Sequence, residues 1–499
     1  FVTAMSGKVA GVQITSTSSQ PGSGTRIVIR GGSSITGSNQ PLFVVNGVPF
    51  DAANSSQSSG FADIDPNSIE SLSILKGAAA SALYGSQAAN GVVLITLKSG
   101  SFNSKPKVTV SHSSSFDQIY EIPLQKTWAQ GFWNGSAWQY VDGETTKSST
   151  SWGPKIADIP GAKYYDRWDV FNTGYAAENN INVTGGNAQA SYYVSFGNLN
   201  NQGVIEPLKF KRSSLNANTS FKFTEKLTIS SNFMYSKQNG SRLTEDASNS
   251  SFMNTLLASP NTWNPYPMRA ENGSLRLYRG GGRDPYLWIL ESAARIFQRD
   301  RLAGTVTVEY TILPKLKFRS VTGVSTTSAN NNDHFNKGGI QVVEGWYNTS
   351  ESFSRDFEST EMVTYENKFG DFSVNAFVGH NIVENNWRGS NFEGTGLIIP
   401  GLYNTSNVSG YSASAYNGKY RAFSFFGEAR IGYKSMLFYT VTGRNDWVSS
   451  IANDFFYPSH SFGFVFSELL ANKDVLSFGK VRASYAKVGA PANAYVTNT

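Results

Sequence analysis

Tryptophan is concentrated in one stretch of the sequence, where aromatic side chains can bind a ligand. Trp128, Trp133 and Trp138 lie within eleven residues, and Trp152 follows soon after. An aromatic ring offers an apolar face for stacking, and the Asn amides of the same segments add hydrogen bonds, which suits sugar rings and equally suits a peptide. We predict that these four tryptophans bind ligand. The alternative is that they pack the loop and contact no ligand.

A second set of candidate residues is charged. In the stretch TRIVIRG, Arg26 and Arg30 alternate with isoleucines, which places both guanidinium groups on one side of a strand. Glu309 and Glu428 occupy polar positions of two later strands, and we predict that they are the partners of these arginines. Buried ion pairs add little net stability, yet they fix how two parts of a fold sit together. Alternatively, Arg30 only hydrogen-bonds nearby carbonyl groups.

Other residue types that carry out chemistry are missing or dispersed. The chain has no cysteine, and His112, His334, His380 and His460 are far apart, without the spacing of a zinc site. The glycine-rich segments match no phosphate-binding motif and are better explained as turns. The 42 basic residues exceed the 36 acidic ones without forming a basic stripe. We therefore expect no enzyme activity, no metal, no cofactor and no nucleic-acid partner.

The first hundred residues have the pattern of a small α+β domain. We predict a strand at 25–31, a hairpin at 42–50 with a type I′ turn at Asn46-Gly47, and a buried strand at 91–98. Between them, a helix with Asp65 as N-cap and Pro66 at its first position runs into a strand, and a second short helix covers 78–91 and is closed by its last glycine.

From about residue 107 the hydrophobic period changes to two and stays there. In GTVTVEY, Val308 lies on one face and Thr307 on the other, and in RAFSFFGEARIGY the residues Phe425 and Ser424 divide in the same way. About 13 such strands follow one another. This change of period predicts a domain boundary, with the small α+β domain at 1–104 and a strand-rich domain at 105–499.

The lengths of the connections between the strands indicate whether the apolar face meets lipid or a protein core. Short and long connections alternate along the chain, with short ones near 185–188, 224–226, 313–315, 370–371 and 434–435 and long ones at about 117–177, 238–297, 328–353 and 382–418. In an up-and-down barrel, every second connection lies on the same rim. One short and one long rim is typical of an outer-membrane barrel, with short periplasmic turns and long extracellular loops. Apolar positions such as Val308 and Phe425 then face outer-membrane lipid.

Several segments resemble one family. The stretch GKVAGVQITSTSSQPGSGTRIVIRGGSSITGSNQPLFVVNGVPF and the later SIESLSILKGAAASALYGSQAANGVVLITLKSG resemble the plug of the SusC/RagA group of TonB-dependent outer-membrane transporters of Bacteroidota. GRNDWVSS, FFYPSHSFGFVFSE and GKVRASYAKVGAPAN resemble that group's mid-barrel strands. The resemblance covers residues 7–100 almost continuously and fades in the long loops.

This resemblance implies an all-β transmembrane β-barrel of 22 strands with the small α+β plug inside it. It also implies two protein partners, a SusD-like surface lipoprotein and TonB with its inner-membrane energising complex, which together import an oligosaccharide or a peptide. A sheet of about 13 strands leaves open edges in lipid, so we expect the chain to be part of a longer product. The alternative function is a binding or secretion-accessory barrel without energised transport.

Overall fold

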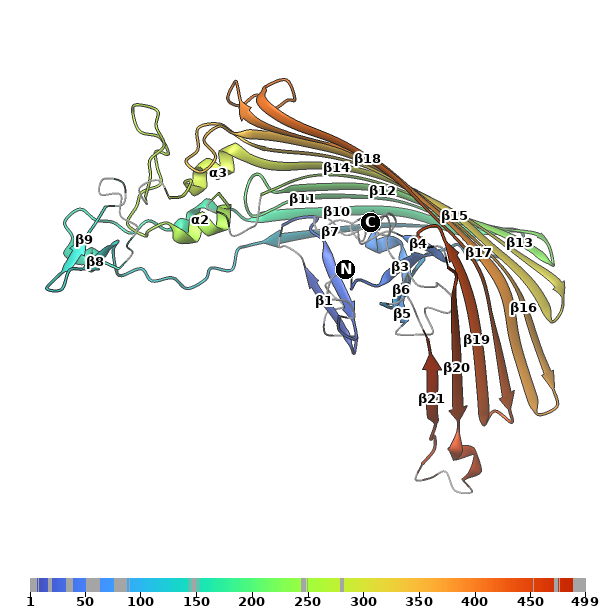
Figure 1. The fold of residues 1–499 in the computed structure, drawn as a ribbon. Helices are drawn as coiled ribbons and strands as arrows, with labels where there is room; N and C mark the ends of the chain where they lie inside the picture. Colours follow the sequence, from blue (N-terminus) through green and yellow to red (C-terminus); the bar gives the residue numbers. More distant parts are fainter. Residues whose placement is uncertain are drawn as a thin grey trace.

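The computed structural model describes the chain outside residues 1–6, 8, 17–19, 33–38, 51–62, 76–87, 89, 143, 145–149, 151, 244–247, 249, 279–281, 452, 471–473, 475 and 488–499. Within the described residues the strands form one 13-stranded sheet, one 4-stranded sheet and two 2-stranded sheets. The large sheet curves, and the N-terminal strands lie on its concave side (Figure 1). The predicted fold class is confirmed.

The N-terminal strands form a small unit, which we call the plug. Its first hairpin pairs β1 (Val12–Ser16) with β2 (Thr25–Ile29), and its sheet has the order β4-β3-β6-β5 with β3 parallel to β6. The bounds are β3 (Leu42–Val45), β4 (Val48–Phe50), β5 (Ile69–Leu75) and β6 (Val92–Leu97). Their buried side chains form one core with residues including Ile27, Phe43, Ile64, Val93, Ile95 and Leu97.

Most local predictions for the plug agree with the structure. Asn46 and Gly47 have φ angles of 48° and 92°, as the predicted type I′ turn requires. The helix predicted from Asp65 is reduced to the single 3₁₀ turn η3 (Pro66–Ser68). The strand β5 begins directly afterwards, because the next residues alternate with period two and pair with β6. The helix predicted at 78–91 lies mostly outside the described residues.

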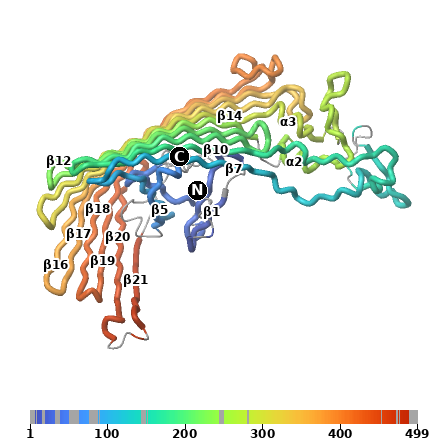
Figure 2. The backbone as a smooth tube through the Cα atoms, turned by 180° about the vertical axis from the view of Figure 1, so that it is seen from behind, coloured from blue at the N-terminus to red at the C-terminus, as the bar shows by residue number. Residues whose placement is uncertain are grey.

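The large sheet runs in chain order with antiparallel neighbours, from β7 at one edge to β21 at the other. Figure 2 shows the same succession from behind. The strands are β7 (Lys107–Asp117), β10 (Gly174–Gly186), β11 (Ala190–Gln202), β12 (Lys209–Thr224), β13 (Leu227–Arg242), β14 (Ala293–Leu313), β15 (Leu316–Phe335), β16 (Trp346–Phe369), β17 (Phe372–Leu397), β18 (Val408–Tyr433), β19 (Leu437–Val448), β20 (Phe455–Phe464) and β21 (Val481–Ala486).

The two faces of this sheet are those that the alternation predicts. Ser424 is 0% exposed, whereas the adjacent Phe425 is 54% exposed. On β14, Arg301 contacts the plug and has the same parity as Thr307, so Thr307 faces inward and Val308 faces outward. Polar side chains thus line the concave face, and apolar ones lie on the convex face.

The alternation of short and long connections holds for the predicted tight turns, with two corrections. The segments 328–353 and 382–418 were predicted to be long loops, but β15 to β18 continue through most of them, and β17 and β18 reach 26 residues each. The backbone ladder continues there, while the alternation fades because polar side chains suit both faces. The connection between β20 and β21 is also longer than a tight turn and contains η7 (Phe466–Leu469).

A second core lies beyond the sheet at the long-loop rim. It is built around α2 (Phe252–Ala258) and α3 (Tyr286–Ser292) and includes the buried Trp263 and Trp288. No helix in the described part of the chain is long and apolar enough to cross a membrane.

Candidate functional site

The plug meets the sheet through two buried carboxylates, Asp63 and Asp65, that face two arginines of the wall, Arg301 and Arg212. We call these four residues the plug seat. The Arg301 Nε lies 3.2 Å from Asp63 Oδ2, and Gln238 Nε2 donates to Asp63 Oδ1 at 2.6 Å. The Arg301 guanidinium also lies 4.0 Å from the centre of a plug ring, Phe50. One barrel arginine therefore contacts both a charge and an aromatic ring of the plug.

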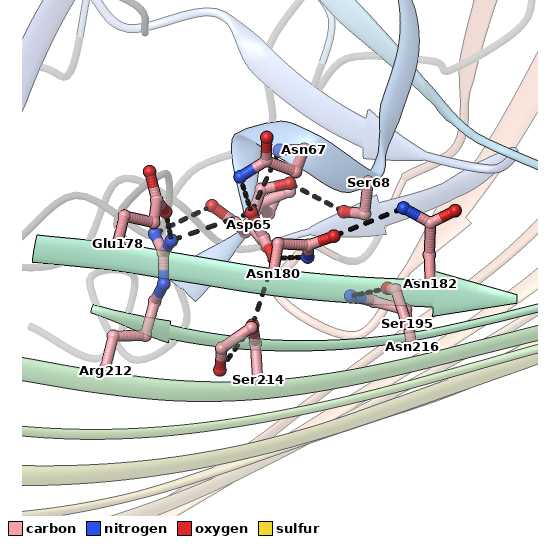
Figure 3. A network of polar contacts seen from close by, with 12 residues as sticks. Asp65, Asn67, Ser68, Glu178, Asn180, Asn182, Ser195, Arg212, Ser214 and Asn216 are labelled. Atoms are coloured by element: carbon pink, nitrogen blue, oxygen red, sulfur yellow. Dashed lines mark hydrogen bonds and ion pairs between the residues drawn. The ribbon is translucent and has the colours of Figure 1, made fainter. Parts of the chain in front are cut away.

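The second half of the plug seat is a larger network (Figure 3). Asn180 Nδ2 donates to Asp65 Oδ2 at 2.8 Å, and the Arg212 guanidinium lies 3.8 Å from the other carboxylate oxygen. Arg212 also donates to the Ile64 carbonyl at 3.1 Å and pairs with Glu178 at 2.6 Å. Strands β10 and β12 therefore hold the plug at one short segment.

The local sequence explains why Asp65 reaches the wall. Asp65 is the N-cap of η3, where its Oδ1 accepts from the Asn67 backbone N–H at 2.9 Å, which fixes the direction of the carboxylate. On the barrel side, Gly197 leaves the space that the carboxylate fills. A Cβ at this position would overlap Asp65 Oδ2, so a larger residue would displace the carboxylate.

The plug seat is suited to holding rather than to catalysis. Its four side chains are almost completely buried, and each carboxylate faces a cation and an amide donor. In such a site desolvation offsets most of the Coulomb attraction, so the pairs set position more than they add stability. Among the described residues, no group of three or more His, Asp or Glu is placed to hold a metal ion.

Further contacts between plug and wall are uncharged. The Gln20 side-chain amide makes two hydrogen bonds of 2.9 Å with the Leu243 backbone, one to its carbonyl and one from its N–H. Met234 of β13 is buried within the plug core. On β15, Gly323 lies against the tip of the plug hairpin, where an added Cβ would be 3.2 Å from the Val48 Cβ.

The two glutamates predicted to bind the plug arginines have other partners. Glu309 pairs with Arg319 of the adjacent strand at 3.5 Å, and Glu428 pairs with Arg430 of its own strand at 3.1 Å. Both glutamates therefore pair with arginines of the barrel wall, which lie close to them by register and by the period of the strand.

The predicted plug arginines, Arg26 and Arg30, are exposed, and the structure does not bring them to those glutamates. Their contact with the barrel stays a prediction. The pairs that the structure does form have the opposite polarity, with acids on the plug and arginines on the wall. Sequence reasoning missed them, although two aspartates in the short segment ADIDP are a signal in an otherwise apolar and small-residue region.

The predicted tryptophans lie together at the end of the long-loop rim. Trp138 is 6.1 Å from Trp128 and 5.4 Å from Trp133, measured between ring centres. We call these three residues the tryptophan cluster. Trp133 is 51% exposed, so these rings do not form a closed core. The Lys155 ammonium lies 5.8 Å from the Trp128 ring, which adds a cation beside the aromatic surface.

A small hairpin presents these rings. Strands β8 (Gly131–Trp133) and β9 (Trp138–Tyr140) place Trp133 opposite Trp138, and the Asn134 side chain accepts hydrogen bonds within the tight turn between them. Trp152 is 56% exposed, and its backbone N–H donates to the Gly131 carbonyl at 3.0 Å. The fourth predicted tryptophan therefore borders the same hairpin.

The segments on either side of the hairpin are hydrogen-bonded to the part of the chain that carries the second core. Asn261 Nδ2 donates to the Trp128 carbonyl at 3.0 Å, and Arg276 binds both carboxylate oxygens of Glu144 at 2.8 and 2.9 Å. Partial burial, and then the carboxylate of Asp142, raises the pKa of the Tyr140 hydroxyl, which is neutral and hydrogen-bonds Thr262. The arrangement offers a preformed aromatic surface with a hydrogen-bond donor, as a sugar or peptide ligand requires.

Comparison with known proteins agrees with this geometry. Residues 2–92 match the model of the TonB-dependent Receptor Plug Domain. The chain is 26% identical to TonB-dependent receptor P26 of Formosa agariphila over 97% of this chain and 49% of that protein. It is 32% identical to TonB-dependent receptor SusC of Bacteroides thetaiotaomicron over 47% of this chain and 22% of that protein.

Among solved structures, the fold is similar to the RagAB peptide importer in its closed-closed state. The TM-score is 0.77 at 20% sequence identity, over 98% of this chain and 58% of that one. The chain thus spans about half the length of the curated relatives that it matches along its whole length. The plug and this part of the wall are what the relatives share with it.

Proposed function

Since the chain belongs to the SusC/RagA group of TonB-dependent outer-membrane transporters, we propose that the whole protein imports an oligosaccharide or peptide nutrient across the outer membrane. The energy is supplied through TonB from the inner membrane. A SusD-like lipoprotein covers the long-loop rim and holds the nutrient against it. These relatives are named as receptors and as an importer, in line with transport rather than catalysis.

The observation that carries this proposal is a folded plug held on the wall by a few local contacts. The plug has its own core and its own sheet, and no plug strand joins the 13-stranded sheet within the described residues. Its polar contacts with the wall are concentrated at the plug seat and around Gln20. Such an attachment closes the lumen yet can be released by a pull, because each buried ion pair is close to energetic balance.

The tryptophan cluster supports the substrate class and the lid. Its half-exposed rings leave stacking faces open at the long-loop rim, where nutrient and lipoprotein would meet. A relative of similar fold is named a peptide importer, which favours a peptide, while the aromatic surface suits a sugar equally. Uptake of labelled oligosaccharides and of labelled peptides by cells that carry the protein distinguishes the two classes.

A removable cross-link tests whether the plug must move. The chain has no cysteine, so a Val48→Cys, Gly323→Cys pair gives one defined disulfide between plug and wall. A Cβ on residue 323 would lie 3.2 Å from the Val48 Cβ, a few tenths of an ångström below the usual range for a disulfide and within reach of small adjustments. We expect oxidised cells to lose uptake and reductant to restore it. In a strain without TonB, uptake should be absent under both conditions.

The two single-cysteine variants are the matched controls, since neither can form the disulfide. Both should transport at the same rate in oxidising and reducing medium. Normal uptake by the fully cross-linked protein would show that the plug does not need to leave this part of the wall. Uptake independent of TonB would favour the alternative, a binding or secretion-accessory barrel.

A further inference from the structure

On two neighbouring strands, the outer face of the sheet changes from mainly apolar to charged side chains at one level. Along β17, the outward positions Val378 and Ile382 are exposed and apolar, His380 between them pairs with Glu361 of β16, and the next outward position is Glu384. Along β18, the outward residues Phe425 and Phe423 are followed by Arg421. The register pairs Glu384 with Arg421 and Ile382 with Phe423, so the change occurs at the same height on both strands.

Three cations converge at this level. Arg421 Nε lies 2.9 Å from Glu384 Oε2, Lys419 Nζ lies 3.0 Å from the same oxygen, and Arg355 Nη2 lies 3.2 Å from Glu384 Oε1. We call Arg355, Lys419 and Arg421 the outer basic cluster. One carboxylate serves three cations, which leaves two positive charges in excess. The side chains are 51%, 41% and 64% exposed, so their remaining donors face outward.

The height of the cluster matches the edge of the apolar band. Glu384 stands twelve residues beyond Phe372, where β17 leaves its tight turn. With about 3.3 Å per residue and a strand tilt of about 40°, this is roughly 30 Å along the barrel axis, slightly more than the apolar band of about 25 Å. The cluster therefore lies where lipid headgroups begin, on the long-loop side.

Aromatic side chains border the cluster on its membrane side. Phe423 lies 6.0 Å from Trp447 and 5.0 Å from Phe425, measured between ring centres, and all three rings are exposed on the outer face. Aromatic belts of this kind mark the boundary between headgroups and acyl chains. An acyl chain can lie on these rings while a headgroup attached to it reaches Arg421.

We propose that the outer basic cluster binds a phosphate group on a lipid of the outer leaflet, with the acyl chains against the neighbouring aromatic belt. Glu384 holds the three cations at one point and reduces their mutual repulsion, while their outward donors meet the phosphate oxygens. Arginine suits this ligand because its planar donors match the geometry of a phosphate. The site is outside the barrel and is independent of the nutrient.

Native mass spectrometry of the full-length protein in detergent tests the proposal. The probes are a monophosphorylated acylated disaccharide lipid and its dephosphorylated analogue. We expect the wild-type protein to retain the phosphorylated lipid at least about tenfold better, since each basic residue near an anionic lipid surface contributes appreciably to binding. Arg355→Gln, Lys419→Gln, Arg421→Gln together should abolish this preference, and Arg421→Gln alone should reduce it.

A matched control removes three charges elsewhere. Lys226→Gln, Lys315→Gln and Lys434→Gln change exposed lysines of the short turns by the same total charge and should keep the preference. Heat-modifiable gel mobility identifies folded protein. Equal retention of the two lipids by the wild-type protein, or an unchanged preference in the folded triple variant, overturns the proposal. Displacement of the lipid by inorganic phosphate at the same concentration overturns the assignment to a lipid.

Discussion

The plug seat and the tryptophan cluster present their side chains in opposite ways. At the plug seat, Asp63 and Arg301 are almost fully buried, and both are fixed by protein groups. In the tryptophan cluster, Trp133 and Trp138 are about half exposed, and only their backbone hairpin is fixed. A site that holds two parts of a protein together must satisfy its own polar groups, whereas a site that waits for a ligand leaves surface uncovered.

Because of this difference, mutations in one region should change folding stability and mutations in the other should change ligand binding. Removing one partner of a buried ion pair leaves an uncompensated charge, so the plug seat should respond to mutation through stability. Removing an exposed ring exposes little buried surface, so it should change stability little and should reduce ligand binding. Mutations in the two regions should therefore have different readouts.

The largest effect is expected at the plug seat. Arg301→Met leaves the buried Asp63 carboxylate without its cation, and we expect the plug to lose about 3 to 5 kcal/mol of its attachment to the wall. Planar-bilayer recordings of the full-length protein should then show more frequent opening of the lumen. Urea-induced unfolding in lipid vesicles measures the accompanying loss of stability.

The double variant Asp63→Asn, Arg301→Met separates charge from packing. It removes both charges and leaves the neighbouring Gln238 with an amide partner, so most of the loss should be recovered. Equal losses in the single and double variants would mean that Arg301 acts through its contact with Phe50 and that the ion pair is not what positions the plug.

A somewhat smaller effect distinguishes the two faces of the strand that carries Arg301. Val308 faces outward and Thr307 inward on β14. Val308→Arg should cost about 2 to 4 kcal/mol if the residue lies near the bilayer midplane, while Thr307→Arg should be much milder because the lumen is polar. Folding into lipid vesicles gives both values. Similar costs at the two positions would contradict the assignment of inside and outside.

The architecture was readable from the sequence because it rests on local patterns. Period-two alternation defined the strands and both faces of the sheet, and Asn46-Gly47 fixed a turn. The ends of β15 to β18 at the long-loop rim were missed, since a strand with polar side chains on both faces has no apolar alternation to detect. The helix predicted from Asp65 was too long, because a good N-cap signal was followed by strand periodicity.

The two candidate sites were predictable to different degrees. The tryptophan cluster comes from one short segment, so its members were visible as neighbours in the sequence. The plug seat joins residues more than a hundred positions apart. The sequence around Asp65 or Arg212 does not identify the residue with which each one pairs. Arg26 and Arg30 were chosen because their alternation placed them on one side of a strand, but alternation gives a face and not a partner.

The smallest effect, and the sharpest test of the comparison, concerns the tryptophan cluster. Replacing Trp128, Trp133 and Trp138 together by Ala should weaken nutrient binding by about 1 kcal/mol per ring that stacks on the ligand, with little change in the free energy of unfolding.

Trp263→Ala is the contrasting control. This ring is 6% exposed in the second core, so its loss should cost about 3 to 5 kcal/mol of local stability. Growth on the nutrient and heat-modifiable gel mobility are measured for both variants. If the triple variant grows normally with normal mobility, the rings do not contact ligand; if it loses both, they are structural, and the contrast between the two regions fails.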